Sequence, residues 1–373
     1  MKKTILIIVA LAALLIIGYG SYRASSNAPQ ANTYKIGVVA TLTDSGANLG
    51  VPWTNGMKMA ADEINAAGGI NGKKLELSIQ DAKIEPASSL NAVNYLLNVS
   101  KPDVYEVLFQ VSANTITSIL RQNKKPLISE AFGRSIVDEN PYAFKGNFDA
   151  LTGCEDMARY LNENNKYTKL GVLMSKVEYN DLCLRGIQKI VPDVSVYRYV
   201  YGDTDFRTFL TKANNDGVDM LATIGIDPEY TLMFKQIGEL GYHIKLACAT
   251  ASECITPDVA GKVPANVIDG TIGIDFIPPK IQDTEFGKKY ASLHANPGGV
   301  DYVYAAIGYE STYYIGKAMK ECAPSDPACL VNALGKVEGY KTILGSKGFL
   351  DRVLQLNYRM YEWKNGEWNV ISD

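Results

Sequence analysis

The chain has 373 residues, is 47% hydrophobic and 21% charged, and carries a formal net charge of −3. This length accommodates two domains with a core each, and the composition is that of a soluble globular protein. A small net charge without a basic run argues against nucleic acid as a partner. The only two histidines, His243 and His294, lie far apart in the sequence. A histidine-based metal site or catalytic triad is therefore not expected, and we expect no cofactor.

The first 33 residues have the organisation of an export signal followed by a linker. Lys2 and Lys3 precede an apolar run, Ile5 to Gly18, and small residues of the cleaved kind follow at Ser25 to Ala28. Pro29 would directly follow a cut there, and the run is shorter than the ~20 residues of a spanning helix. No Cys follows the run, which excludes lipoprotein acylation. A cleaved signal peptide and an uncleaved anchor both remain open. Either places the folded part in the periplasm or at the outer face of the cytoplasmic membrane.

From residue 35 onward, short apolar strands alternate with amphipathic helices. The first helix, 53–67, places Met57, Ala60 and Ile64 on one stripe, and the glycines of 68–72 end it. Pro86 suits the first turn of the next helix because that position needs no N–H group. The strands expected in this first series are 35–41, 75–80, 104–109 and 127–129, and the helices are 53–67, one from 86, and 115–123.

A second series of the same kind begins after a connecting stretch at 142–150. Strand–helix alternation at this spacing indicates parallel sheets with helices on both faces, so we expect an α/β protein with two doubly wound lobes. A long helix at 300–320, a strand at 353–363 and a hairpin turn at 364–367 end the chain. The strands expected in the second series are 170–174, 194–200, 220–224 and 246–248, and the helices are 151–162, 181–191, 206–214 and 229–240.

Six cysteines, all after residue 150, agree with export. An even number in an exported protein indicates disulfides, and the absence of any CxxC motif disfavours zinc. Two pairs are close in sequence, and the remaining two cysteines are both expected near the starts of helices. The spacing favours the pairs Cys154–Cys183, Cys248–Cys254 and Cys322–Cys329.

The sequence offers little sign of catalysis. It contains no GxSxG, HExxH or GxxxxGK[ST] motif. The glycines at 68–72 follow a helix rather than a strand, which indicates a helix stop and not a phosphate loop. A pair of catalytic carboxylates stays open in principle, but nothing singles one out. We therefore expect a binding protein rather than an enzyme.

Parallel sheets bind ligands outside the carboxyl ends of their strands. In this chain those positions are polar and contain small residues, and several precede the N-terminus of a helix. If the two lobes face each other, all of them line one cleft. They are 42–53, 110–114 and 130–135 in the first lobe, and 175–181, 225–229 and 249–253 in the second.

The segment Gly56–Leu77, with Asp81 after the next strand, resembles a motif of the Leu/Ile/Val-binding family of type I periplasmic solute-binding proteins. The resemblance extends from about Lys35 to the C-terminus and is looser after the first segment. It implies two lobes joined by three crossovers, near 146–150, 273–279 and 349–353, which close over a small ligand. Lobe one would comprise 34–147 and 277–350, and lobe two 148–276 and 351–373. It also implies delivery to an ABC permease in the cytoplasmic membrane, and we expect a monomer.

The same resemblance implies a ligand site, although several of its usual residues differ here. Relatives that bind amino acids hold the carboxylate with hydroxyl and N–H groups of lobe one and the ammonium with an acid of lobe two. Gly133 stands where a Thr is expected, and Thr250 where the acid is expected. Glu130 and Arg134 could contact a polar ligand or pair with each other at the surface. We expect the surface pair. The candidate ligand residues are Trp53, Gln110, Ser112, Ala131, Phe132, Tyr179, Asp227, Thr250 and Glu253.

Each candidate has a simpler structural role as an alternative. Trp53 is equally suited to the core, Tyr179 could pack beside the next helix, and Asp227 is suited to capping a helix. At the level of function, the leading hypothesis is a transport receptor for an amino acid or a similar small molecule. The alternatives are a membrane-anchored sensory ectodomain of the same fold and an enzyme built on it.

Overall fold

The computed structural model describes residues 33–225, 228–323, 326–339 and 342–372. The segment on which the export prediction rests, residues 1–32, lies outside them. Within the described part of the chain, no helix is both long enough and apolar enough to span a membrane.

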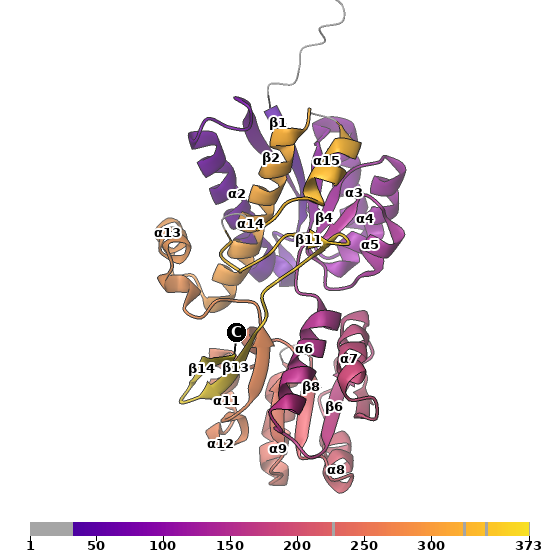
Figure 1. The fold of residues 1–373 in the computed structure, drawn as a ribbon, viewed down its shortest axis with the longest axis vertical. Helices are drawn as coiled ribbons and strands as arrows, with labels where there is room; N and C mark the ends of the chain where they lie inside the picture. The colour runs from indigo at the N-terminus through magenta and orange to yellow at the C-terminus, as the bar shows by residue number, and fades with distance from the viewer. Residues whose placement is uncertain (1–32, 226–227, 324–325, 340–341, 373) are drawn as a thin grey trace, which may run out of the picture.

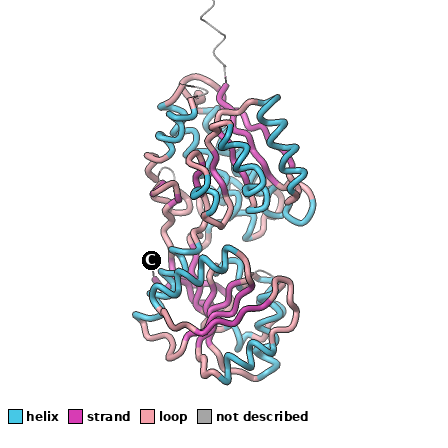
Figure 2. The backbone as a smooth tube through the Cα atoms, turned by 90° about the vertical axis from the view of Figure 1, so that its right-hand side faces the viewer, coloured by secondary structure: helices cyan, strands magenta, loops and turns pink. Residues whose placement is uncertain are grey.

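Two seven-stranded, mostly parallel sheets form two bodies, one above the other along the long axis of the molecule (Figure 1). Helices cover both faces of each sheet, as the strand–helix alternation predicted. Figure 2 shows the same separation from the side, with the chain passing between the bodies in several segments.

The first sheet has the strand order β11-β12-β5-β4-β3-β1-β2. All its pairs are parallel except β11 with β12, and β1 lies between β2 and β3. The elements of this lobe are β1 (Thr33–Ala40), η1 (Asp44–Gly46), α2 (Ala47–Ala66), β2 (Lys74–Asp81), α3 (Pro86–Tyr95), η2 (Leu96–Ser100), β3 (Val104–Val107), α4 (Gln110–Gln122), β4 (Leu127–Ser129), α5 (Ser135–Glu139), β5 (Ala143–Lys145), η3 (Ile281–Asp283), α13 (Glu285–Leu293), α14 (Gly299–Glu321), α15 (Pro327–Leu334), β11 (Phe349–Leu350) and β12 (Val353–Leu354).

The second sheet has the strand order β14-β13-β10-β9-β8-β6-β7. Its pairs are parallel from β7 to β10, and the C-terminal hairpin adds two antiparallel strands at the other edge. The elements are α6 (Ala150–Glu163), β6 (Leu170–Ser175), α7 (Glu178–Ile190), β7 (Ser195–Tyr199), α8 (Arg207–Asn215), β8 (Met220–Ile224), α9 (Glu229–Leu240), β9 (Lys245–Cys248), α10 (Ala251–Cys254), α11 (Pro257–Lys262), α12 (Ala265–Ile268), β10 (Ile272–Asp275), β13 (Arg359–Lys364) and β14 (Glu367–Ser372).

The chain passes between the sheets after β5, after β10 and after β12. Residues 353–354 pair with β5 of the first sheet, whereas the expected boundary assigned everything after 350 to lobe two. Apart from this difference, the lobe boundaries remain a prediction. The strand expected at 353–363 is in fact two strands, β12 and β13, which belong to different sheets. The strand-like pattern of apolar residues runs on through the crossover because Leu356, between the two strands, is itself buried.

Helices α2 and α14 pack closely on one face of the first sheet. A Cβ atom at Gly56 would lie 1.9 Å from the carbonyl oxygen of Ala305, and one at Gly308 would lie 2.2 Å from that of Trp53. Glycine at these two positions lets the backbones approach, so the two helices bury a common apolar face. Most of α14 is buried, which agrees with the long helix predicted at 300–320.

Two helices, α2 and α4, begin well before their predicted starts. Helix α2 begins at Ala47 and contains Pro52, although proline usually disfavours a helix interior. Helix α4 begins at Gln110 because the chain turns sharply at Phe109, whose φ is 73°. The predicted loop at 110–114 is therefore the first turn of a helix.

The structure contains the three disulfides that the spacing favoured. Cys154–Cys183 joins α6 to α7, Cys248–Cys254 joins β9 to α10, and Cys322–Cys329 joins the end of α14 to α15. Each therefore fixes two neighbouring elements of one lobe.

Candidate functional site between the lobes

The loops that follow the parallel strands of the two sheets meet between the lobes. Phe132, after β4, lies edge-on to Tyr179, on α7, with 5.2 Å between ring centroids. The Tyr179 hydroxyl lies 3.1 Å from that of Thr250, which follows β9. Phe148, at the first crossover, has its ring centroid 6.2 Å from that of Tyr179 and 6.2 Å from that of Phe276. Three of the nine candidate residues are thus in one chain of contacts.

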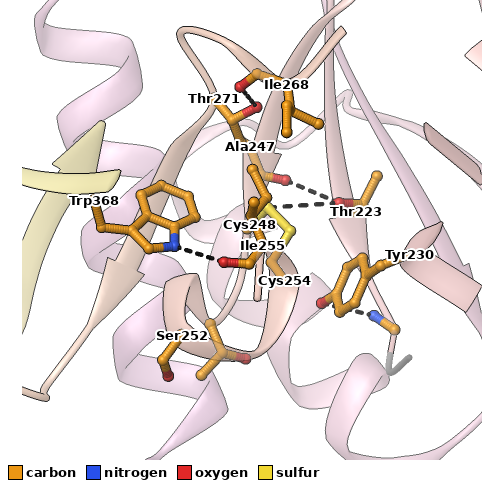
Figure 3. The surroundings of a disulfide bond; sticks show 12 residues. Thr223, Tyr230, Ala247, Cys248, Ser252, Cys254, Ile255, Ile268, Thr271 and Trp368 are labelled. Carbon is orange, nitrogen blue, oxygen red and sulfur yellow. Dashed lines mark hydrogen bonds between the residues drawn. A yellow bond between two sulfur atoms is a disulfide. The ribbon is translucent and has the colours of Figure 1, made fainter. Parts of the chain in front are cut away.

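A disulfide supports the lobe-two side of this site. Thr250 and Glu253 lie within or next to the loop that Cys248–Cys254 closes, and the indole Nε1 of Trp368 donates to the carbonyl of Ile255 over 3.1 Å (Figure 3). The crosslink and this hydrogen bond limit the movement of α10, so Thr250 and Glu253 are presented from a fixed turn.

Glu253 is the half-buried acid of this turn. Burial and the nearby charge of Asp275 raise its pKa to about 7, against the lowering effect of a hydrogen bond from Thr250. Burial also raises the pKa of Asp275, but this carboxylate accepts N–H groups from Ser252 and Phe276, each over 2.8 Å. Asp275 is therefore satisfied by the backbone, whereas Glu253 keeps capacity for a ligand.

Tyr304, on α14 of lobe one, lies near acids of both lobes. Burial raises its pKa well above the usual value, and the charges of Glu253 and Glu130 raise it further. Since Glu130 belongs to lobe one and Glu253 to lobe two, the charges of acids from both lobes act on Tyr304.

The other lobe-one candidates, Gln110 and Ala131, form hydrogen bonds with neighbouring residues of lobe one. The Gln110 amide oxygen accepts the N–H group of Gly133 over 2.8 Å, and its amide nitrogen donates to Asn114. The N–H group of Ala131 donates to the hydroxyl of Ser129 over 3.2 Å. These groups hold the 130–135 loop against α4.

Two further candidates are not brought to the contacts around Tyr179. Ser112 is buried, and its hydroxyl accepts a hydrogen bond from Ser89 over 3.0 Å. Trp53 is fully buried in the lobe-one core beside α14. Asp227 lies outside the described residues. The ligand role of all nine candidates remains a prediction.

The surface pair expected between Glu130 and Arg134 is absent. Glu130 is only 2% exposed, and Arg134 instead makes a two-pronged ion pair with Asp149, over 2.7 and 2.5 Å. Asp149 also accepts the N–H group of Thr152 at the start of α6. The correction follows from the crossover, which brings Asp149 beside Arg134 while β4 leads Glu130 into the lobe.

Sequence reasoning missed a buried ionisable cluster in lobe one, formed by Glu106, Glu130, Lys145 and Glu310. Burial raises the pKa of Glu130 to about 8 and that of Glu310 to about 7, and it lowers that of Lys145 to about 8. Burial also raises the pKa of Glu106, with the charge of Glu130 as the second cause. The one signal in the sequence that could have revealed the cluster was Glu106, a single acid inside the apolar strand predicted at 104–109.

Glu178 adds a second contact between the lobes. Its carboxylate lies 3.4 Å from the N–H group and 3.4 Å from the hydroxyl of Ser135. A Cβ atom at Gly133 would lie 2.6 Å from this carboxyl group. The glycine that replaces the expected Thr therefore makes room for an acid of the other lobe.

Neither a metal site nor a cavity elsewhere among the described residues accounts for this arrangement. Among the described residues, no group of three His, Cys, Asp or Glu side chains is placed to hold a metal ion. A cavity of about 480 Å³ lies at the opposite, amino-end edge of the second sheet, lined by residues such as Tyr242, His243 and Lys245. That position is not where parallel sheets usually bind ligands.

Comparisons with known proteins identify relatives over nearly the whole chain. Residues 33–367 match the family described as periplasmic binding protein. The Leu-, Ile-, Val-, Thr- and Ala-binding protein of Pseudomonas aeruginosa is 23% identical over 368 residues, which are 94% of each chain.

Solved structures show the same fold. The substrate-binding protein of a branched-chain amino acid transporter from Streptococcus pneumoniae, in complex with isoleucine, has a TM-score of 0.73 and 22% identity, covering 91% of this chain and 100% of its own. A solute-binding protein of an ABC transporter from Rhodopseudomonas palustris, in complex with p-hydroxybenzoic acid, has a TM-score of 0.75 and 19% identity, covering 91% and 95%.

Proposed function

Since the chain belongs to the periplasmic binding protein family, we propose that it is the extracytoplasmic receptor of an ABC transporter. It binds an amino acid or a similar small organic molecule between its two lobes and delivers it to a permease in the cytoplasmic membrane. The protein is a binding protein and not an enzyme.

The observation that carries this proposal is the set of contacts among Phe132, Tyr179 and Thr250. Phe132 comes from one lobe, and the other two residues come from the other. All three follow the carboxyl ends of parallel strands, where this class of sheet binds ligands. A ligand that touches these residues contacts both lobes at once and favours the closed arrangement.

The crossovers provide the hinge of this mechanism. The first of them carries Asp149, whose carboxylate binds Arg134 and accepts the N–H group of Thr152. The backbone N–H group of Asp149 donates to the Tyr358 hydroxyl over 3.0 Å. Tyr358 belongs to the third crossover. Two crossovers are thus tied together, which supports a rotation of the lobes as units.

A ligand screen tests the proposal. The purified exported protein is heated with amino acids, amides, carboxylates, amines and small aromatic compounds, and its unfolding midpoint is recorded. A ligand of the folded state raises the midpoint by mass action. We expect a concentration-dependent rise for one chemical class and its loss on Tyr179→Ala. A protein that folds normally and responds to no compound of the panel would contradict the receptor function.

The alternative, a membrane-anchored sensory ectodomain, rests on the uncleaved-anchor interpretation of the N-terminal segment. Cell fractionation separates the two. Release of the protein with the periplasmic fraction, without detergent, supports the transport receptor. A requirement for detergent supports the anchored form.

A further inference from the structure

We propose that the ligand is an organic ammonium ion that carries no carboxylate, held between aromatic rings and acidic side chains of both lobes. This inference rests on the proposed function, because it names the chemical class of the ligand bound between the lobes. Four sets of observations support it.

The first concerns the two acids whose charges act on Tyr304. Glu253 comes from lobe two and Glu130 from lobe one, and both lie near Tyr304. Both carboxyl oxygens of Glu130 are buried and have no hydrogen-bond partner within the described part of the chain. The charge of Lys145 lowers the pKa of Glu130, but burial outweighs it, so a further cation that approaches this carboxyl group stabilises its charged form.

The second concerns the rings. Phe132, Tyr179, Phe148 and Phe276 form a continuous cluster beside Thr250, with centroids 5.2 to 6.2 Å apart. The faces of such rings attract alkylammonium groups, and the attraction increases where water is excluded. Rings combined with acids therefore suit a cation that also has an apolar body.

The third concerns the donors that would hold a ligand carboxylate in lobe one. Three backbone N–H groups of the 130–135 loop already have acceptors within the protein. That of Ala131 donates to Ser129, that of Gly133 to Gln110, and that of Ser135 is directed to Glu178. A ligand carboxylate would compete with these partners and would meet the negative charge of Glu178.

The fourth concerns the cations at the site. Arg134 is neutralised by Asp149, and the Lys145 ammonium group donates to the carbonyl oxygens of Asn147 and Phe148. Lys176, just before α7, is exposed, where water and salt screen its charge. The described residues thus offer acids to a ligand more readily than they offer cations.

A matched series of compounds tests the inference by calorimetry at pH 8. Isoleucine is compared with 2-methylbutylamine, which lacks its carboxylate, and with 3-methylpentanoate, which lacks its ammonium group. Tyramine and p-hydroxybenzoate form a second, aromatic pair. We expect the amines to bind roughly tenfold or more tightly than the zwitterion and the acids.

Two variants connect this preference to the site. Glu253→Gln should weaken amine binding roughly tenfold, because the carboxylate that pairs with the ammonium group is lost. Asp258→Asn, an exposed acid on α11 that pairs with Lys262, is the control and should leave binding unchanged. Lys176→Gln should also leave amine binding unchanged.

The outcomes separate the inference from the proposed function. If isoleucine or an acid binds more tightly than the amines, the cation inference is overturned and the receptor function stands. Loss of ligand binding in Lys176→Gln has the same meaning. Tight binding of a neutral compound from the wider panel has the same meaning. Absence of binding by every compound overturns both. Equal loss of amine binding in Glu253→Gln and Asp258→Asn overturns the assignment to this site.

Discussion

The ring of Phe132 in one lobe meets the ring of Tyr179 in the other, edge to face, with 5.2 Å between their centroids. Both residues belong to loops that follow the carboxyl ends of parallel strands, so the contact lies where a ligand is expected. Aromatic pairs of this geometry contribute about 0.5–1.5 kcal/mol beyond their buried area. The contact therefore has a consequence for lobe closure.

Phe132→Ala should shift the ligand-free protein toward open lobes. The substitution removes an apolar contact that exists only when the lobes are close, so the equilibrium moves by about 1 kcal/mol or more. Small-angle X-ray scattering should record a larger radius of gyration. Tyr95→Ala, at an exposed position on α3, is the matched control and should not change it. An unchanged radius in Phe132→Ala would show that this contact does not hold the lobes together.

The stability of the protein should decrease as the pH rises from 6.5 to 8. Burial raises the pKa of Glu130 to about 8 and that of Glu310 to about 7, above the value of 4.5 expected in the unfolded chain. In this interval the folded protein binds more protons than the unfolded chain, so the free energy of unfolding falls with pH, on the order of 1–2 kcal/mol. Urea unfolding at the two pH values measures the change.

Glu253, whose pKa is raised to about 7 mainly by burial, acts in the same interval and adds to the fall, whereas the following groups act mainly outside it. The lowered pKa of His294 acts below pH 6.5, and the lowered pKa of Lys145, about 8, raises stability at higher pH. Glu310→Gln should reduce the fall between pH 6.5 and 8. Its carboxylate accepts the N–H group of Leu344 and the hydroxyl of Ser346, and a glutamine oxygen can replace part of this bonding. Stability that rises with pH in the wild-type protein would contradict the prediction.

Much of the fold could be predicted because strand–helix periodicity is a local signal. Helix α9 has the expected bounds, Glu229–Leu240, and α14 differs from its prediction by one residue at each end. Errors arose where tertiary contacts dominate local preference. Helix α2 contains Pro52 because its first turns pack on β1, where a Cβ atom at Gly50 would lie 1.8 Å from the Thr41 carbonyl oxygen.

The candidate site was less predictable, because its contacts join residues far apart in the sequence. Tyr179 and Thr250 could be proposed separately from the loops that contain them, but their hydroxyl contact depends on the order of strands in the second sheet. The burial of Glu130 was missed, since the residue follows a three-residue strand and resembles a surface loop residue. Long-range pairing, and not composition, decided both outcomes.

The disulfides should contribute unequally to stability. In the chain-entropy description, a crosslink stabilises more when it closes a longer loop. Cys154–Cys183 spans 29 residues and Cys322–Cys329 spans 7. The double substitution to Ser should therefore cost roughly 3–4 kcal/mol at the first pair and about 2–3 kcal/mol at the second. Guanidinium unfolding of the two oxidised variants compares them, and a larger loss at Cys322–Cys329 would contradict this order.

Asp149→Asn should destabilise the crossover more than removal of an exposed ion pair. The Asp149 side chain is 1% exposed, binds Arg134 with two oxygens and caps α6, and Arg134 is 30% exposed. The substitution leaves the partly buried guanidinium without its counter-charge. Solvent that reaches Arg134 reduces the cost of this unpaired charge. We therefore expect a loss of about 2–3 kcal/mol in the free energy of unfolding.

Glu155→Gln is the matched control, because Glu155 forms ion pairs with Arg159 and Lys189, whose side chains are about half exposed. Exposed pairs contribute about 0–1 kcal/mol, so this variant should remain close to wild type. Urea unfolding in low and in 1 M salt completes the comparison. Salt should reduce the small effect of Glu155→Gln and leave that of Asp149→Asn largely intact, because the buried pair is poorly screened. Equal losses in the two variants would mean that the Arg134–Asp149 pair acts as an ordinary surface pair and does not secure the hinge.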